Sequence, residues 1–180
     1  MKNIALIGFM GTGKTSVGIK LADMLEWSFV DTDKLIEEKM GMPIPDIFEK
    51  FDEKRFRLEE KLAVEGVSNN TNQVISTGGG VVLNKDNVVC LKQSALLICL
   101  KANPQTILER VGHDSSRPLL AGENPLKIII NLLKLREPYY QCADLYLDTS
   151  EMTVQEAANE ILYQLQKWGV SDVRCNKGQS

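Results

Sequence analysis

The chain is organised around the stretch Gly8-Phe9-Met10-Gly11-Thr12-Gly13-Lys14-Thr15. The apolar run from Ile4 to Ile7 precedes it and predicts a short buried strand, and a helical pattern with Val17 and Leu21 on one face follows it. Strand, glycine-rich loop and helix in this order are the context of a phosphate-binding loop. Glycine lets the backbone bring N–H groups close to an anion, and the helix N-terminus adds partial positive charge there. The stretch therefore predicts nucleotide binding.

Two side chains of this loop have chemistry that suits a nucleotide. Lys14 can reach the β- and γ-phosphates, and the Thr15 hydroxyl can ligate Mg²⁺. The residues expected to bind the phosphates are Gly11, Thr12, Gly13, Lys14, Thr15 and Ser16. The alternative is a plain glycine turn with a chance Lys-Thr pair, which the flanking strand and helix disfavour.

Length and composition are those of an ordinary globular protein. The 180 residues suffice for one well-buried core, and the net charge of -3 argues against a broad basic surface for nucleic acid. No run is long enough to cross a bilayer, and the N-terminus lacks the shape of a signal peptide, so no membrane partner is expected. The four cysteines are scattered, which fits reduced thiols in a cytoplasmic enzyme better than a zinc site.

Apolar, strand-like runs alternate with helical patterns, which predicts an α/β fold with a largely parallel sheet. The expected strands cover residues 4–7, 27–31, 74–76, 95–100 and 145–147. Beyond the loop, helical patterns cover 34–40, a short stretch through Phe48, 52–65, 85–91, 104–110, 125–140 and 154–168. Residues 1–168 are expected to form one domain, followed by a flexible tail at 169–180.

Two carboxylates, Asp31 and Asp33, stand where the second expected strand ends. Ligands of open parallel sheets bind at the carboxyl ends of the strands, so both should face the crevice of the glycine-rich loop. One can hold Mg²⁺ through water, and the other can accept a proton from a substrate hydroxyl. The alternative is that Asp33, or Thr32, only caps the next helix. We favour a functional Asp33, because capping requires only one such residue.

A run of glycines, Gly78 to Gly80, closes the third expected strand. It indicates backbone that comes close to a ligand or adopts positive φ, although a plain flexible turn fits the spacing nearly as well. Arg117 lies in a polar loop that could close over a nucleotide, whereas a single arginine is usually a solvated surface residue.

Together these pieces closely resemble the shikimate kinase family, from Ile4 to about Trp168. The glycine-rich loop alone indicates only a superfamily, and the specific signal is an ordered set of further motifs. These are Asp31-Thr32-Asp33, Ile47-Phe48-Glu49, Phe56-Arg57-x-x-Glu60, Thr77-Gly78-Gly79-Gly80, Arg117-Pro118-Leu119-Leu120 and Arg136-x-Pro-x-Tyr140.

The resemblance implies a fold and an activity. The family has a three-layer α/β/α fold of the nucleoside-monophosphate-kinase type, with a five-stranded parallel sheet and a mobile lid, here about residues 111–124. Its members transfer the γ-phosphoryl group of ATP to the 3-hydroxyl of shikimate with the help of Mg²⁺, toward chorismate and the aromatic amino acids. The resemblance also implies a monomer whose partners are shikimate and ATP.

Roles for individual residues follow from the same resemblance. Catalytic roles are implied for Lys14, Asp33 and Arg117. Metal binding is implied for Thr15 and Asp31, with Thr15 as the ligand and with Asp31 and Ser76 in the water shell of the metal. The shikimate-binding residues would be Asp33, Arg57, Gly79, Gly80 and Arg136, in or near a substrate-binding region at about 31–61. Arg110 and Arg117 would help to bind ATP, with Arg110 near the adenine. Glu60 would orient Arg57, and Phe48 and Phe56 would wall the pocket.

Two positions depart from common patterns. The loop Asp148-Thr149-Ser150-Glu151 lacks the basic residue that some relatives carry near the adenine, so base selectivity is expected to rest more on backbone contacts. Ser76 stands where many P-loop proteins carry an aspartate, so Asp31 is expected to take over that duty.

Three alternatives stay open. A kinase for another polyol acid, such as gluconate, would also suit the trio of Asp33, Arg57 and Arg136. A nucleotide-switched binding module of the GTPase kind is disfavoured, because Asn84-Lys85-Asp86 lacks the spacer of a guanine-reading motif. A catalytically dead relative is disfavoured, because every residue that the family needs for transfer is present.

Overall fold

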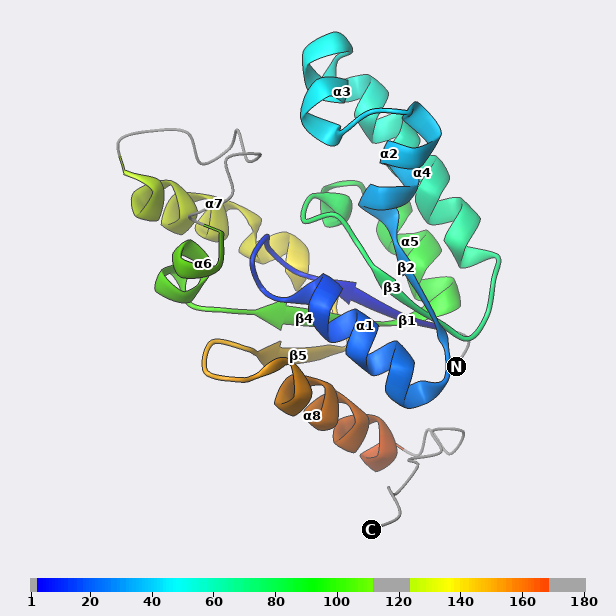
Figure 1. Ribbon diagram of the computed structural model, residues 1–180, viewed down its shortest axis with the longest axis vertical. Coiled ribbons are helices and arrows are strands. Elements are labelled where there is room, and N and C mark those ends of the chain that lie inside the picture. The colour runs from blue at the N-terminus through cyan, green and yellow to red at the C-terminus, as the bar shows by residue number, and fades with distance from the viewer. Residues whose placement is uncertain (1–2, 112–123, 169–180) are drawn as a thin grey trace.

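The computed structural model describes residues 3–111 and 124–168 (Figure 1). Its strands form one parallel sheet in the order β2-β3-β1-β4-β5. They are β1 (Asn3–Ile7), β2 (Ser28–Asp31), β3 (Gln73–Ser76), β4 (Ala95–Lys101) and β5 (Leu145–Asp148). Every boundary lies within one residue of the predicted one, and the predicted five-stranded parallel sheet is confirmed.

Helices cover both faces of this sheet. They are α1 (Lys14–Leu25), α2 (Thr32–Met40), α3 (Ile44–Lys50), α4 (Glu53–Ser68), α5 (Lys85–Ser94), α6 (Pro104–Val111), α7 (Pro125–Tyr140) and α8 (Val154–Lys167), with a 3-10 turn at Val81–Leu83. Side chains of β1 alternate between the two faces, as strand geometry requires. Ile4 and Leu6 pack in one core with residues of α1 and α8, and Ala5 and Ile7 pack in another with residues of α4 and α5. The predicted three-layer α/β/α architecture is confirmed.

Helices α2, α3 and the start of α4 extend away from the sheet, on the side opposite α8 (Figure 1). They have a small core of their own, made of Ile36, Ile47 and Phe56. At its base, the buried Glu59 of α4 binds Lys39 of α2 at 2.7 Å. This ion pair ties the helix that begins beside Asp33 to the helix that carries Arg57.

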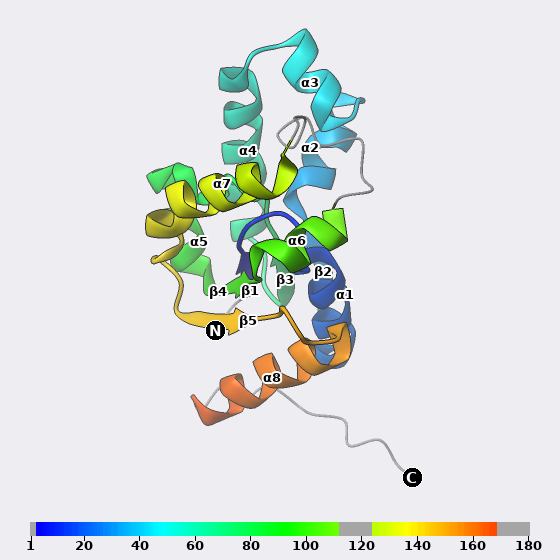
Figure 2. The same cartoon turned by 90° about the vertical axis from the view of Figure 1, so that its left-hand side faces the viewer.

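Helices α6 and α7 lie side by side near the loop that follows β1 (Figure 2). Phe9 of this loop is buried against Ile107, Val111 and Ile129 of the two helices. This apolar contact anchors the loop to α6 and α7. The predicted lid at about 111–124, with Arg117, lies almost wholly outside the described residues, as does the predicted tail. None of the helices in the two described ranges is both long and apolar enough to span a bilayer.

Candidate active site

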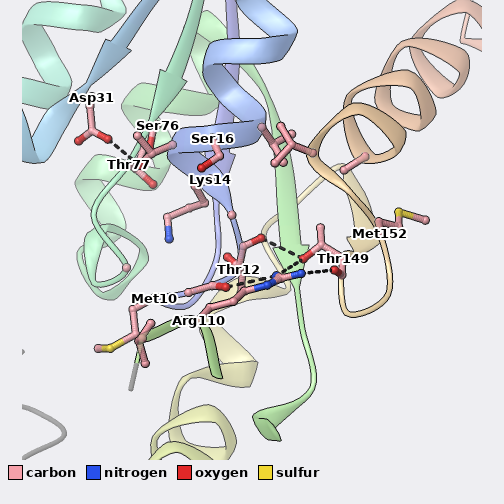
Figure 3. A pocket seen from close by; sticks show the side chains of 18 of the residues that line it. Met10, Thr12, Lys14, Ser16, Asp31, Ser76, Thr77, Arg110, Thr149 and Met152 are labelled. Carbon is pink, nitrogen blue, oxygen red and sulfur yellow. Dashed lines mark hydrogen bonds between the residues drawn. The ribbon is translucent and has the colours of Figure 1, made fainter. Parts of the chain in front are cut away.

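A cleft of about 560 Å³ opens where the carboxyl ends of β1, β2 and β3 meet. Figure 3 shows Asp31 and Ser76 at one end, Lys14 between, and Arg110, Thr149 and Met152 toward the other end. Of the residues singled out in the sequence, the cleft wall contains Gly11, Thr12, Gly13, Lys14, Thr15, Ser16, Asp31, Asp33, Ser76, Gly79 and Arg110. Arg57, Gly80 and Arg136 lie beyond it, on the side of α4 and α7.

The glycine-rich loop has a backbone that only glycine adopts easily. Gly11 and Gly13 have φ values of 74° and 91°, and a Cβ on Gly8 would collide with the carbonyl oxygen of Leu100. Gly13 is the N-cap of α1, and no described side chain caps the helix there. The first N–H groups of α1 therefore face the loop, which is the arrangement of an anion site.

Lys14 is nearly buried under this loop. Its Nζ donates to the carbonyl oxygens of Gly8 at 2.9 Å and Phe9 at 2.8 Å. The hydroxyl of Thr12 donates to the same Phe9 oxygen at 2.8 Å. The ammonium group is thus held inside the curve of the loop, where it faces the space that phosphates would fill.

Three side-chain oxygens converge at the other side of the α1 N-terminus. The Thr15 hydroxyl donates to Asp31 Oδ2 at 3.0 Å and lies 3.4 Å from Ser76 Oγ. A carboxylate and two hydroxyls are hard oxygen donors, and these residues fit Mg²⁺. The second oxygen of Asp31 accepts from the backbone N–H groups of Asp33 and Lys34. Asp31 is therefore the residue that caps α2, and the alternative that Asp33 or Thr32 serves as the cap is wrong.

Asp33 has one carboxyl oxygen that no hydrogen bond of the described residues uses. This oxygen, Oδ1, is buried. Burial, aided by the charge of Asp31 and opposed by that of Lys14, raises the pKa of Asp33 to about 6. The group thus lies in the cleft as an acceptor whose basicity is above that of an ordinary aspartate.

The guanidinium of Arg57 lies between two carboxylates of its own helix. Its Nη1 donates to both oxygens of the buried Glu60, at 3.1 and 3.0 Å, and its Nε and Nη2 donate to Glu53 at 3.2 and 3.1 Å. Burial opposes the charge of Arg57, but the two carboxylates outweigh it and raise the pKa of the guanidinium. The predicted orienting role of Glu60 is consistent with this geometry, whereas sequence reasoning missed Glu53.

Aromatic rings flank these charges. The rings of Phe48 and Phe56 are 4.7 Å apart, and the guanidinium of Arg57 lies over Phe56 at 5.3 Å. Arg136 of α7 lies over the ring of Phe9 at 5.6 Å. Burial raises the pKa of Glu60, and the positive charges of Arg57 and Arg136 both oppose that rise. The positive charges of two arginines, from different helices, therefore both act on the same buried carboxylate.

The glycine run after β3 is shaped by its neighbours. None of Gly78, Gly79 and Gly80 has a positive φ, so that part of the prediction is wrong. A Cβ on Gly78 would lie 2.6 Å from Asp33 Oδ1, and one on Gly80 would lie 2.7 Å from Arg57 Nη1. The close approach is therefore to the two candidate substrate-binding side chains.

Three further contacts of the site had no signal in the sequence. The hydroxyl of Tyr140, four residues after Arg136, donates to the carbonyl oxygen of Gly79 at 2.7 Å. Arg110 donates to the carbonyl oxygens of Gly11 at 3.3 Å and Thr149 at 2.7 Å. A buried Tyr140 could have been expected from its place on the inner face of α7, but its partner could not.

Comparisons with known proteins agree with this geometry. A family model described as shikimate kinase matches residues 10–166. A curated shikimate kinase of Caldanaerobacter subterraneus subsp. tengcongensis is 51% identical over 162 residues, which cover 90% of this chain and 95% of that protein. A solved shikimate kinase of Acinetobacter baumannii, in complex with shikimate, is 37% identical with a TM-score of 0.89, covering 93% of this chain and 94% of that one.

The gluconate alternative has weaker support from the same comparisons. A solved gluconokinase of Sinorhizobium meliloti 1021 covers 94% of both chains, but at 15% identity and a TM-score of 0.57. That likeness shows a shared fold alone. The sequence matches extend over nearly the whole length of the chain and of its shikimate kinase relatives, and we conclude that the chain belongs to the shikimate kinase family.

Proposed function

We propose that this chain transfers the γ-phosphoryl group of ATP to the 3-hydroxyl of shikimate, which gives shikimate 3-phosphate and ADP. The observation that carries the proposal is the placement of Asp33. Its carboxyl group has a raised pKa, lines the same cleft as Lys14, and packs against the glycine run beside Arg57. The cleft region thus brings together a carboxylate that can accept a proton, a loop that can bind phosphates, and a guanidinium that can bind a carboxylate.

The nucleotide end of the cleft supports ATP binding. Backbone N–H groups from Gly11 to Ser16 and the N-terminus of α1 would bind the phosphates, with the Lys14 ammonium facing the β- and γ-phosphates. Arg110 would contact the nucleoside. Arg117, outside the described residues, would approach the transferring group from the lid, where an arginine is worth about 10³–10⁵-fold in related chemistry.

The oxygens of Thr15, Asp31 and Ser76 support Mg²⁺ as the cofactor, with Thr15 as a direct ligand and Asp31 and Ser76 acting through water. When bound, the metal would neutralise charge on the phosphates during transfer. Thr15 and Asp31 already share a hydrogen bond, which keeps their oxygens close together at the N-terminus of α1.

Shikimate would bind on the side of α4 and α7. Its carboxylate suits the guanidinium groups of Arg57 and Arg136, since each offers paired N–H donors. Its ring hydroxyls would contact Asp33 and the backbone of Gly79 and Gly80. Asp33 would accept the proton of the 3-hydroxyl as its oxygen attacks the γ-phosphorus, a role typically worth about 10²–10⁴-fold.

The test is an assay of ADP release with Mg·ATP, run without acceptor, with shikimate and with gluconate. We expect strong stimulation by shikimate alone. Stimulation by gluconate alone would assign the chain to the other polyol acid. Stimulation by neither, with ATP still bound, would favour a nucleotide-switched binding module.

We also propose that the enzyme acts as a monomer in the cytoplasm. The family resemblance supports the monomer, and the scattered cysteines support a reducing compartment. Light scattering after gel filtration tests the first proposal, since a dimer would have about twice the 20.1 kDa mass of the chain.

A further inference from the structure

Thr149, the residue after β5, is buried although it belongs to a surface loop. Only 2% of its surface is exposed. Its backbone N–H donates to the carbonyl oxygen of Lys101 at 2.8 Å, which continues the pairing of β5 with β4. Its side chain therefore points inward at the edge of the cleft, toward the loop that follows β1 (Figure 3).

The hydroxyl of Thr149 joins three segments that are far apart in the sequence. Oγ1 lies 3.0 Å from the carbonyl oxygens of both Thr12 and Lys101, which share its single proton, and it accepts from Arg110 Nη1 at 3.1 Å. The backbone oxygen of Thr149 accepts from Arg110 Nη2 at 2.7 Å. One residue thus links the phosphate-binding loop, the end of β4 and α6.

Arg110 depends on these contacts for its orientation. It is an exposed side chain with many rotamers, and within the described part of the chain its hydrogen bonds go to Thr149 and to the Gly11 carbonyl oxygen at 3.3 Å. Nη1 and Nη2 of Arg110 both donate to oxygens of Thr149, and these two hydrogen bonds fix the plane of the guanidinium along the cleft wall. Immobilising such a side chain before binding removes an entropic cost that a ligand would otherwise bear.

The position of this cluster indicates which ligand it serves. Figure 3 places Arg110 and Thr149 away from Asp31 and Ser76, across Lys14. With the phosphates over the loop and the metal ligands at Asp31, the nucleoside lies at the Arg110 end. Neither Arg57 nor Arg136 touches this cluster in any hydrogen bond of the described residues.

We propose that Thr149 is a positioning residue for the nucleotide: its hydroxyl holds Arg110 and the Thr12 backbone in the arrangement that binds the nucleoside end of ATP. The inference rests on the proposed function, because it takes ATP as the ligand. It deepens that function by assigning nucleotide affinity, and not shikimate affinity, to one buried hydroxyl.

Two substitutions separate the hydroxyl from the shape of the side chain. Thr149→Val keeps the branched shape and removes the hydroxyl, and Thr149→Ser keeps the hydroxyl. Thr149→Val removes the hydroxyl that accepts a hydrogen bond from the charged Arg110. We therefore expect the Kd for ADP, measured by calorimetry, to be about 5- to 30-fold higher in Thr149→Val than in the unchanged protein. We expect Thr149→Ser to remain within about 3-fold of the unchanged protein, and the Kd for shikimate alone to be unchanged in both.

The matched control is Thr106→Val, on the same helix as Arg110, because the Thr106 side chain has no hydrogen bond among the described residues. We expect its ADP affinity to equal that of the unchanged protein. A second measurement repeats Thr149→Val in an Arg110→Ala background, where the effect of the hydroxyl should shrink markedly because part of its action goes through Arg110.

The outcomes are distinct. ADP affinity that is unchanged in Thr149→Val overturns the inference, and so does an equal loss of ADP and shikimate affinity, which would indicate a merely structural role. If Thr149→Val does not fold, Thr149→Ala against Thr149→Ser decides the same point. Failure of the proposed function shows instead in the unchanged protein, as ADP binding without shikimate-dependent turnover.

Discussion

Glu53 lies one helical turn before Arg57 and accepts hydrogen bonds from its Nε and Nη2 atoms, at 3.2 and 3.1 Å. The Glu53 side chain is 69% exposed, so the pair is of the weak, solvated kind. The same N–H groups would be needed to bind the carboxylate of shikimate. If Arg57 binds that carboxylate as proposed, Glu53 would compete with the substrate, whereas the buried Glu60 holds Nη1 of the guanidinium.

Removing this competitor should strengthen substrate binding. We expect Glu53→Gln to lower the KM for shikimate by about 2- to 5-fold, since exposed ion pairs are worth at most about 1 kcal/mol. The KM for ATP should not change. Initial rates at varied shikimate concentration measure the effect, and Glu65→Gln, an exposed position farther along α4, is the control. A higher KM for shikimate in Glu53→Gln would mean that Glu53 orients Arg57 instead of competing.

Asp33 should impose a pH dependence on turnover. With a pKa of about 6, its carboxyl group is ionised roughly ten to one at pH 7 and loses its capacity to accept a proton as the pH falls. We expect kcat/KM for shikimate to decline below pH 6, and Asp33→Asn to lose about 10²–10⁴-fold in kcat while it still binds ADP. The residual rate of the variant should lack the inflection near pH 6. Near wild-type turnover in Asp33→Asn would exclude Asp33 as the base.

The same raised pKa implies that Asp33 lowers stability at neutral pH. The folded protein holds this carboxylate charged at a cost above pH 6, whereas the unfolded chain, with a pKa of 3.8, bears no such cost. We expect Asp33→Asn to raise the free energy of unfolding by about 2–3 kcal/mol at pH 8, because each pKa unit corresponds to about 1.4 kcal/mol. The gain should shrink as the pH falls from 6 toward 3.8 and vanish by about pH 3, where the carboxyl group is protonated in both states.

Urea unfolding at pH 8 and at pH 3 measures this difference. Asp23→Asn is the control, because the Asp23 side chain is 73% exposed on α1. We expect the control to change stability by less than about 0.5 kcal/mol at either pH. If Asp33→Asn were less stable than the parent at pH 8, the buried carboxylate would be a net stabilising group.

The strands and the phosphate-binding loop were predictable because their signals are local. The run from Ile4 to Ile7 is apolar throughout because β1 is buried on both faces. The strand ends before Gly8, whose positive φ begins the loop. The motifs around Asp33 and Arg57 are equally short-range: Glu60 follows Arg57 by one turn of α4, so helix geometry alone brings the two together.

The remaining contacts of the site are long-range, and no local pattern encodes them. Thr149 and Thr12 are 137 positions apart, and Tyr140 and Gly79 are 61 apart. Even the capping role at α2 required the structure, since Asp31, Thr32 and Asp33 all have side chains that can cap. Only the folded backbone shows that Asp31 caps the helix and that Asp33 is left with an unused oxygen.

Gly78 should be needed for the position of Asp33. A Cβ at Gly78 would lie 2.6 Å from Oδ1, so alanine forces the carboxylate to move. We expect Gly78→Ala to lower kcat by about 10-fold or more, since small misplacements of reacting groups are costly. Gly66→Ala is the control, because a Cβ there meets nothing within 4 Å inside α4, and helix propensity predicts about 1 kcal/mol of added stability. Unchanged turnover in Gly78→Ala would show that Asp33 tolerates displacement.

Tyr140 should couple α7 to the substrate-binding backbone. Its hydroxyl is bound to the Gly79 carbonyl oxygen at 2.7 Å, and Arg136 precedes it by one turn on the same helix. Tyr140→Phe leaves the half-buried Gly79 oxygen without this donor, which costs about 1 kcal/mol. Because the freed segment includes Gly79 and lies next to Gly80 and Arg57, we expect the KM for shikimate to rise about 5-fold or more, with a smaller change in the KM for ATP. Tyr139→Phe, on the exposed side of α7, should match the parent enzyme. A loss of thermal stability with both KM values unchanged would limit Tyr140 to packing.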